Sequence, residues 1–355
     1  MFILGRRNTM NRKEEKLFIV ALSLLLAFVG DTAYAGRGDK AGTSAAPELL
    51  IPVGSREIAL GGSSLSTTSG IEAIYWNPAG VARTSFGTEA LFSYMTYIDD
   101  IGVEYAAITS SFSGLGTVGL SVKSLSFGNI EVTTENAPDG TGQTFSPAYL
   151  TIGLTYSTVL TDRISVGVTT KLITERIDRV SATGVAFDVG IQYSGFANFP
   201  GLSFGVAVKN LGAPMQFDGS GLLREASVGN AQRPASNYLI EASSSELPSV
   251  IEFGVGYHYS FEERNTLSVS TLFQNNNFSD DEYKFGLEYG YDNTLFIRGG
   301  YNLGQESVEN SYIFGATVGA GVHYAFSGLD LAVDYAFRDV QFFSSNHTLS
   351  LKLGF

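Results

Sequence analysis

Cysteine is absent from this sequence, so no disulfide can contribute to its fold. Beyond residue 30 there is no apolar run near 18 residues, which excludes a transmembrane helix there, because a spanning helix needs about 20 apolar residues. Basic residues are also few: 22 Lys and Arg stand against 35 Asp and Glu, giving a net charge of −13. This balance argues against nucleic-acid binding, which needs a basic face to displace counterions.

Clusters of catalytic or metal-binding side chains are missing as well. The three histidines, His258, His323 and His347, lie in separate segments. A Ser-His-Asp site assembles in space, so this spacing does not exclude one, but serine is too common here for such a pairing to be specific. The Gly61-Gly62 pair lacks the flanking strand, helix and Lys of a phosphate-binding loop. We therefore expect no enzymatic activity, no metal site and no cofactor.

Residues 1–35 are interpreted as a cleavable export signal. A basic start precedes an apolar run, 17–29, that only Ser23 interrupts and that is too short to span a membrane. Ala33-Tyr34-Ala35 has the small-x-small pattern of a cleavage site, so the mature chain is expected to begin at Gly36. The alternative is an anchor that stays attached.

The rest of the chain divides into two parts by its pattern. Residues 36–87 are rich in Gly, Ala and Ser without alternation and are interpreted as a periplasmic lead-in and hatch. From Thr88 to Phe355, apolar residues take every second place, which is the side-chain period of a strand. With 18 Tyr, 25 Phe and 41 Gly, this composition favours an all-β fold. A soluble β-sandwich is possible, but a transmembrane antiparallel β-barrel fits better.

About fourteen strands of roughly ten residues can be placed, a length that crosses a bilayer at a strong tilt. The expected spans are 88–98, 102–112, 115–126, 148–160, 163–176, 180–196, 201–210, 248–260, 264–276, 281–291, 293–303, 311–326, 328–338 and 346–355. Connections after even strands are short, whereas those after odd strands include 127–147, 211–247 and 339–345. Membrane barrels have this asymmetry, with short periplasmic turns and long outer loops.

Charges of both signs occupy positions that would face the lumen of such a barrel. They are Lys123, Lys171, Asp188, Lys209, Lys284, Glu288, Arg298, Asp330, Asp334, Arg338 and Lys352. Unpaired charges in lipid cost several kcal/mol each, so these side chains must face a wet or paired interior. The favoured interpretation is a lumen packed with salt bridges, and the alternative is an ion-lined conduit.

The most specific motif is Tyr75-Trp76-Asn77-Pro78-Ala79-Gly80, preceded by Leu60-Gly61-Gly62. Asn-Pro followed closely by Gly is a strong turn signal, so a plain turn before the first strand is one interpretation. The other is a hatch folded in the barrel mouth, with Trp76, Asn77, Pro78, Ala79 and Gly80 as its motif.

This arrangement, ahead of a run of alternating strands, resembles the start of PorV/PorQ family outer-membrane proteins. These belong to the broader FadL-like group of 14-stranded barrels, whose N-terminal hatch carries an Asn-Pro-Ala motif that matches Asn77, Pro78 and Ala79 here. The last segment resembles the insertion signal read by the barrel-assembly machinery. It consists of Leu349, Leu351 and Leu353 with the terminal aromatic Phe355.

The resemblance implies a bacterial outer-membrane protein, embedded in lipid, that assists type IX secretion. PorV-type members bind cargo C-terminal domains leaving the translocon and pass them to surface-attachment machinery. The candidate partner-binding element is the 211–247 loop, with the apolar residues Leu222, Leu223, Tyr238, Leu239 and Ile240. A FadL-like transporter of hydrophobic small molecules is the alternative, which the polar lumen positions disfavour, and a purely structural barrel is a third.

Overall fold

A computed structural model describes residues 42–196, 199–226, 236–262, 264–304 and 312–355. The expected export signal and its cleavage site lie outside these residues. Among the described residues, no helix has the length and apolar character needed to cross a membrane.

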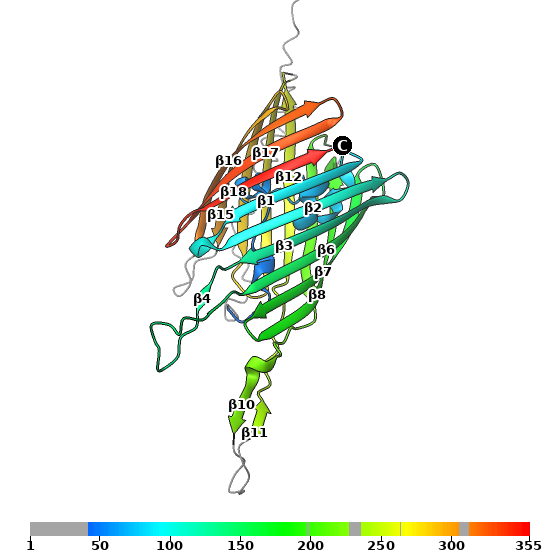
Figure 1. Ribbon diagram of the computed structural model, residues 1–355. Coiled ribbons are helices and arrows are strands. Elements are labelled where there is room, and N and C mark those ends of the chain that lie inside the picture. Colours follow the sequence, from blue (N-terminus) through cyan, green and yellow to red (C-terminus); the bar gives the residue numbers. More distant parts are fainter. Residues whose placement is uncertain (1–41, 197–198, 227–235, 263, 305–311) are drawn as a thin grey trace, which may run out of the picture. The chain divides into compact units, whose positions relative to one another are not determined.

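Fourteen antiparallel strands form a closed barrel in which each strand pairs with its sequence neighbour and β1 pairs with β18 (Figure 1). The strands are β1 (Thr88–Thr96), β2 (Gly102–Phe112), β3 (Gly116–Ser126), β6 (Ala148–Val159), β7 (Ile164–Ile177), β8 (Val180–Ser194), β9 (Leu202–Gly212), β12 (Val250–Phe261), β13 (Asn265–Asn276), β14 (Glu282–Tyr291), β15 (Leu295–Gly304), β16 (Phe314–Phe326), β17 (Leu329–Val340) and β18 (Asn346–Gly354). The predicted fold class and strand count are confirmed, and every predicted strand end lies within three residues of the observed one.

Two of the long connections contain short hairpins that the sequence pattern did not predict. The 127–147 segment holds β4 (Ile130–Glu131) and β5 (Thr144–Phe145), and the 211–247 segment holds β10 (Leu223–Ala226) and β11 (Ser236–Leu239). Both emerge from the same end of the barrel, which we call the long-loop rim. The opposite end, with the turns 113–115, 160–163, 292–294 and 327–328, is the short-turn rim.

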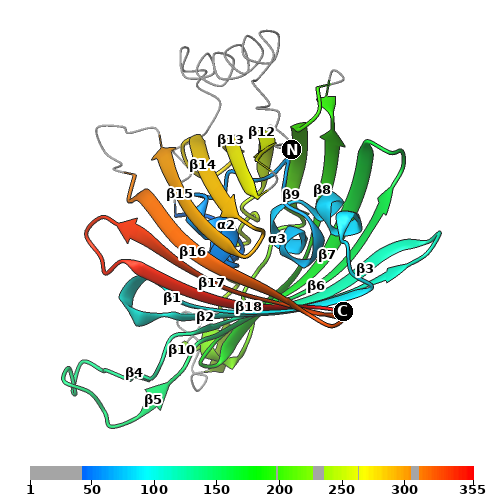
Figure 2. The ribbon, with the colours of Figure 1, turned by 90° about the horizontal axis from the view of Figure 1, so that it is seen from above.

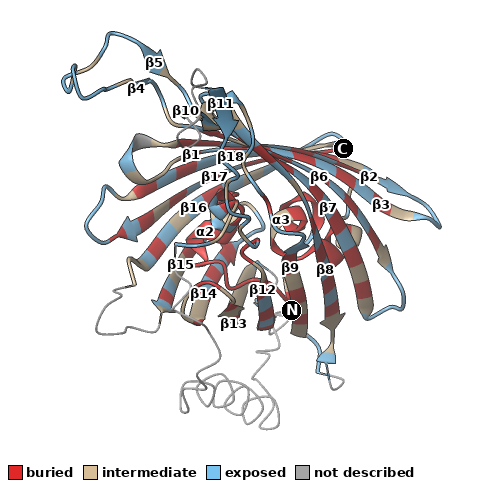
Figure 3. Ribbon diagram, turned by 90° about the horizontal axis from the view of Figure 1, so that it is seen from below, coloured by how far each residue is buried: buried red, intermediate tan, exposed pale blue. Residues whose placement is uncertain are grey.

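Burial alternates along the strands, as the striping in Figure 3 shows. In β18, Thr348 and Ser350 are buried toward the lumen, whereas Leu349 and Leu351 are exposed on the outside. This is the reverse of a soluble protein, and it follows from a barrel whose outer surface faces hydrocarbon.

The segment before β1 folds inside the barrel, where Figure 2 shows α2 and α3 within the ring of strands. Its helices are short: η2 (Pro47–Leu50), α2 (Ser55–Ala59), η3 (Gly70–Glu72), α3 (Ala73–Trp76) and η4 (Pro78–Arg83). We call residues 42–87 the hatch. Its apolar side chains, such as Ile58, Ile71 and Trp76, form one cluster with Leu91 and Val103 of the barrel wall.

Candidate functional site

The side chain of Asn77 makes hydrogen bonds that hold the hatch together. It leaves α3 in an extended conformation and caps η4, accepting a hydrogen bond on Oδ1 from the Ala79 N–H at 3.1 Å. Pro78 then takes the first helical position, where its missing N–H costs nothing. The Asn77 Nδ2 group donates to the carbonyl oxygens of Leu65 at 2.9 Å and Ile191 at 3.3 Å. Asn77 is fully buried and therefore connects two parts of the hatch to β8.

Trp76 and Tyr75 fix the upstream part of the hatch. The Trp76 Nε1 group donates to the Val53 carbonyl at 3.1 Å, and the Tyr75 hydroxyl donates to the Leu49 carbonyl at 3.1 Å. The Trp76 ring packs directly on Gly62, where a Cβ would stand 2.6 Å from the ring. Gly62 also has a φ of 73°, so both space and backbone require glycine there.

A set of inward-facing glycines makes room for the hatch backbone. At each of them an added Cβ would collide with a hatch atom: Gly167, Gly190, Gly205, Gly254, Gly256, Gly286, Gly300 and Gly319. They come from seven strands between β7 and β16. The wall is thus contoured to hold this hatch, and we call these residues the glycine seat.

Arg56 joins the hatch to strand β14 of the barrel wall. Its guanidinium bonds both carboxylate oxygens of Glu288, at 3.0 and 3.1 Å, and reaches Glu57 at 2.9 Å. Glu72 lies 3.7 Å away and also accepts from Lys352. Burial alone lowers the pKa of Arg56, but the carboxylates of Glu288, Glu57 and Glu72 outweigh it and raise that pKa well above its ordinary value. No local sequence pattern predicts this cluster.

The lumen charges are mostly paired, in agreement with the salt-bridge interpretation. Arg298 bridges Glu288 at 2.6 Å and Asp334 at 2.5 Å. Two further pairs are Lys171–Asp188 at 2.6 Å and Lys209–Glu252 at 2.9 Å. A bulge between β8 and β9, with Asn210 at a φ of 61°, lets Asn210 accept from Lys171 and donate to the Pro248 carbonyl.

Glu48 is an exception. Its side chain is buried beside the carboxyl of Glu175, and it forms no salt bridge with a cation among the described residues. Burial, reinforced by the nearby carboxyl of Glu175, raises the pKa of Glu48 to about 8. Burial likewise raises the pKa of Glu57 to about 7, although Arg56 opposes the shift. Both groups therefore favour the protonated form more than an exposed carboxyl does.

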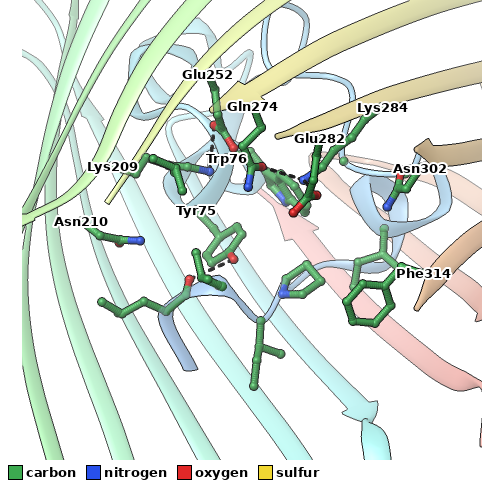
Figure 4. A pocket seen from close by; sticks show the side chains of 18 of the residues that line it. Tyr75, Trp76, Lys209, Asn210, Glu252, Gln274, Glu282, Lys284, Asn302 and Phe314 are labelled. Atoms are coloured by element: carbon green, nitrogen blue, oxygen red, sulfur yellow. Dashed lines mark hydrogen bonds and ion pairs between the residues drawn. The ribbon is translucent and has the colours of Figure 1, made fainter. Parts of the chain in front are cut away.

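A cavity of about 280 Å³ lies between the hatch and the long-loop rim (Figure 4). The hatch contributes Tyr75 and Trp76, and the strands contribute Lys209, Glu252 and Lys284. Among the described lining residues, four are cationic and two are carboxylates: Lys171, Lys209, Lys284, Arg338, Glu252 and Glu282. Among the described residues, no three His, Asp or Glu side chains are grouped to hold a metal ion.

The residues predicted for partner binding meet at the base of the β10–β11 hairpin. Leu223 pairs with Leu239 across the two strands, and the Ile240 N–H donates to the Leu222 carbonyl at 3.0 Å. Leu223, Tyr238, Leu239 and Ile240 are exposed, whereas Leu222 is half-buried. The connection is anchored at both ends, because Met215 and Leu247 pack with Ala46 and Leu49 of the hatch.

The closing strand places the predicted insertion residues on the lipid side. Leu349, Leu351 and Phe355 are exposed, and Leu353 is half-buried. The backbone of Phe355 exchanges hydrogen bonds with Thr88, which extends the β1–β18 seam.

Comparison with known proteins gives one family and one fold. The sequence profile of the family described as "Type IX secretion system protein PorV" matches residues 35–276. No curated protein matches the chain. The fold is similar to that of the Pseudomonas putida toluene transporter TodX, with a TM-score of 0.53, 13% identity and 84% of this chain and 96% of that chain covered. The Ralstonia pickettii toluene transporter TbuX gives a TM-score of 0.51 and 13% identity, covering 85% of this chain and 98% of that one. At such identities the similarity shows a shared fold alone.

Proposed function

Because this chain belongs to the PorV family of type IX secretion system proteins, we propose that it binds the C-terminal domains of secreted cargo and passes them to surface-attachment machinery. It is an outer-membrane β-barrel, so the long-loop rim faces outward and the short-turn rim faces the periplasm. Cargo and translocon would meet this protein at the long-loop rim. The closing strand, with Leu349, Leu351, Leu353 and Phe355, is proposed to be read by the barrel-assembly machinery.

The observation that carries this proposal is the exposed apolar base of the β10–β11 hairpin. Leu223, Tyr238, Leu239 and Ile240 are between 42% and 58% exposed, on an element that Figure 1 draws beyond the barrel strands. Exposed apolar side chains grouped on a water-facing element mark interaction surfaces. Lipid does not explain them, because they lie outside the barrel strands.

The seated hatch supports the same proposal by making passage of protein through the lumen unfavourable. Cargo going through the barrel would have to break the Arg56–Glu288 pair and the Asn77 bonds to Leu65 and Ile191. It would also expose the glycine seat, where the hatch backbone now fills the space. Handling at the rim requires none of these changes.

A transporter of hydrophobic small molecules is the second candidate. The cavity above the hatch favours it, as does the fold shared with solved structures named as toluene transporters. The cavity is lined by six charged side chains among the described residues, which is unfavourable for a purely apolar solute.

The test is a variant with Leu223, Tyr238, Leu239 and Ile240 all changed to Ser, produced in a strain that secretes a type IX cargo. The control carries Leu115→Ser and Leu160→Ser, which are exposed at the short-turn rim. We expect cargo to stay in the cell or remain unattached in the hairpin variant but not in the control. Both variants should keep heat-modifiable migration. Normal cargo attachment in the hairpin variant would contradict the assignment. Detergent pull-down adds a direct comparison, because copurified translocon or cargo supports secretion and bound lipid supports transport.

A further inference from the structure

Arg338 is a buried cation that forms no salt bridge with a carboxylate of the described residues, and Glu282, which lines the same cavity, acts on it only from a longer distance. It is 5% exposed, and no carboxylate of the described residues lies within 4.0 Å of its guanidinium. Every other cation that lines the lumen cavity has one: Lys171 pairs with Asp188, Lys209 with Glu252, and Lys284 with Glu282. A buried charge normally has a partner, so a partner for Arg338 is missing from this part of the chain.

The side chains in contact with Arg338 orient its guanidinium without forming an ion pair with it. The group stacks on the Phe314 ring with 4.0 Å to the ring centroid, and the Tyr97 ring lies 5.8 Å away. The amide oxygen of Asn346 accepts from Arg338 Nη2 at 2.7 Å and from Nε at 3.2 Å. Arg338 itself lines the cavity. A guanidinium held flat in this way suits a planar carboxylate, which it can bind through two parallel hydrogen bonds.

The rest of the cavity determines the size and character of the ligand. Its volume, about 280 Å³, is roughly twice that of an apolar cavity that accepts benzene. Ile58, Tyr75 and Trp76 give the hatch side an apolar and aromatic surface, while Arg338 comes from strand β17 of the barrel wall. Among the described lining residues, cations outnumber carboxylates by four to two.

We propose that this cavity is a binding site for a small organic carboxylate with an aromatic or short apolar body, in which Arg338 pairs with the carboxylate. The body would lie against Tyr75 and Trp76. The ligand would reach the cavity from the long-loop rim, and the hatch would stay in place. The proposal is independent of cargo binding at the hairpin, so either can fail without the other.

Ligand binding can be measured by the fluorescence of Trp76, because it is the only tryptophan in the chain and lines the cavity. Purified full-length protein in detergent would be titrated with 4-nitrobenzoate, whose nitro group quenches indole fluorescence, and with the neutral isostere 4-nitrobenzamide. We expect saturable quenching of Trp76 by the carboxylate and at least about tenfold weaker binding of the amide. Equal quenching by both compounds, or only linear collisional quenching, would overturn the proposal.

Variants then assign the effect to Arg338. Arg338→Gln should weaken 4-nitrobenzoate binding at least about tenfold, and Arg338→Lys should restore part of it. The matched control is Arg179→Gln, an arginine that is exposed at the long-loop rim. If Arg338→Gln does not fold, competition of unlabelled benzoate against 4-nitrobenzoate in the unaltered protein decides: displacement by benzoate but not by benzamide supports the site. Unchanged affinity in a folded Arg338→Gln protein would contradict it.

Discussion

The side chain of Asn77 occupies the space that a Cβ on Gly190 would need. One residue belongs to the hatch and the other to β8, 113 positions later in the chain. The same Asn77 side chain donates to the carbonyl of Ile191, the next residue of that strand. The hatch motif is therefore complementary to the wall at the level of single atoms.

Replacing Gly190 with Val should destabilise the seated hatch. The added side chain would displace Asn77, and overpacking of this kind costs about 1–3 kcal/mol. We expect a lower thermal midpoint in detergent and faster trypsin cleavage within the hatch. Gly299→Val is the matched control, since a Cβ there meets only the Thr317 carbonyl, at 3.9 Å. Equal stability of the two variants would contradict the tight fit.

Asn77→Asp separates the two roles of Asn77. The carboxylate still accepts from the Ala79 N–H, but it cannot donate to Leu65 or Ile191 and places a charge beside their carbonyls. We expect Asn77→Asp to lower the thermal midpoint at least as much as Asn77→Ala does, because an unsatisfied buried charge costs more than an unsatisfied dipole. A thermal midpoint for Asn77→Asp close to that of the unaltered protein would show that the cap alone matters.

Arg56→Met should be among the most destabilising single changes in the hatch. It removes the cation that Glu57, Glu72 and Glu288 share, and breaking a buried pair in this way costs about 3–5 kcal/mol. The double variant with Glu57→Gln should recover part of the loss, because Arg56 is the cation that pairs with Glu57, whereas Glu288 keeps its bridge to Arg298. Arg179→Met, which breaks an exposed pair with Asp178, should change the unfolding free energy by less than about 1 kcal/mol. Similar losses in the two single variants would refute the role of the Arg56 cluster.

Glu48 should make the folded protein less stable as the pH rises. Its pKa is raised from 4.5 to about 8 on folding, so the stability linked to its protonation is fully present below about pH 4.5 and lost as pH rises through 8. Glu57 acts in the same direction, up to about pH 7. We expect the thermal midpoint of the unaltered protein to decrease as the pH rises from 5 to 9. In the Glu48→Gln variant the decrease should be smaller and should occur mostly below pH 7. A profile unchanged by Glu48→Gln would show that this carboxyl is not buried as described.

The parts of the fold that were predictable from the sequence are those encoded locally. Alternation within about ten residues located every barrel strand, because each strand has one lipid face and one lumen face. The hairpins β4–β5 and β10–β11 were missed, since strands of two and four residues are too short to show a period. The contacts between the hatch and the barrel wall could not be predicted from the sequence for another reason. Arg56 meets Glu288 and Ser55 meets Ser350 across more than 200 positions, and no local pattern encodes such a pairing.

Candidate site residues divide in the same way. The motif around Asn77 was recognisable because turn chemistry is local, although its bond to Ile191 was not. The inward glycines were visible as residues between apolar ones, but that pattern does not reveal that a hatch fills the space beside them. Arg338 was identified as a lumen charge, whereas the absence of a nearby carboxylate among the described residues could be found only in three dimensions.

We propose that cargo is handled at the long-loop rim while the hatch stays in place. The absence of cysteine allows this to be tested with an engineered disulfide between hatch and wall. Ser55 and Ser350 have their Oγ atoms 2.8 Å apart, so a small shift would allow cysteines at these positions to form a disulfide. Cargo release and surface attachment would be measured in Ser55→Cys/Ser350→Cys cells before and after reduction, with the single-cysteine variants as controls. We predict normal secretion with the disulfide closed; secretion that stops in the oxidised protein and returns on reduction would contradict the account.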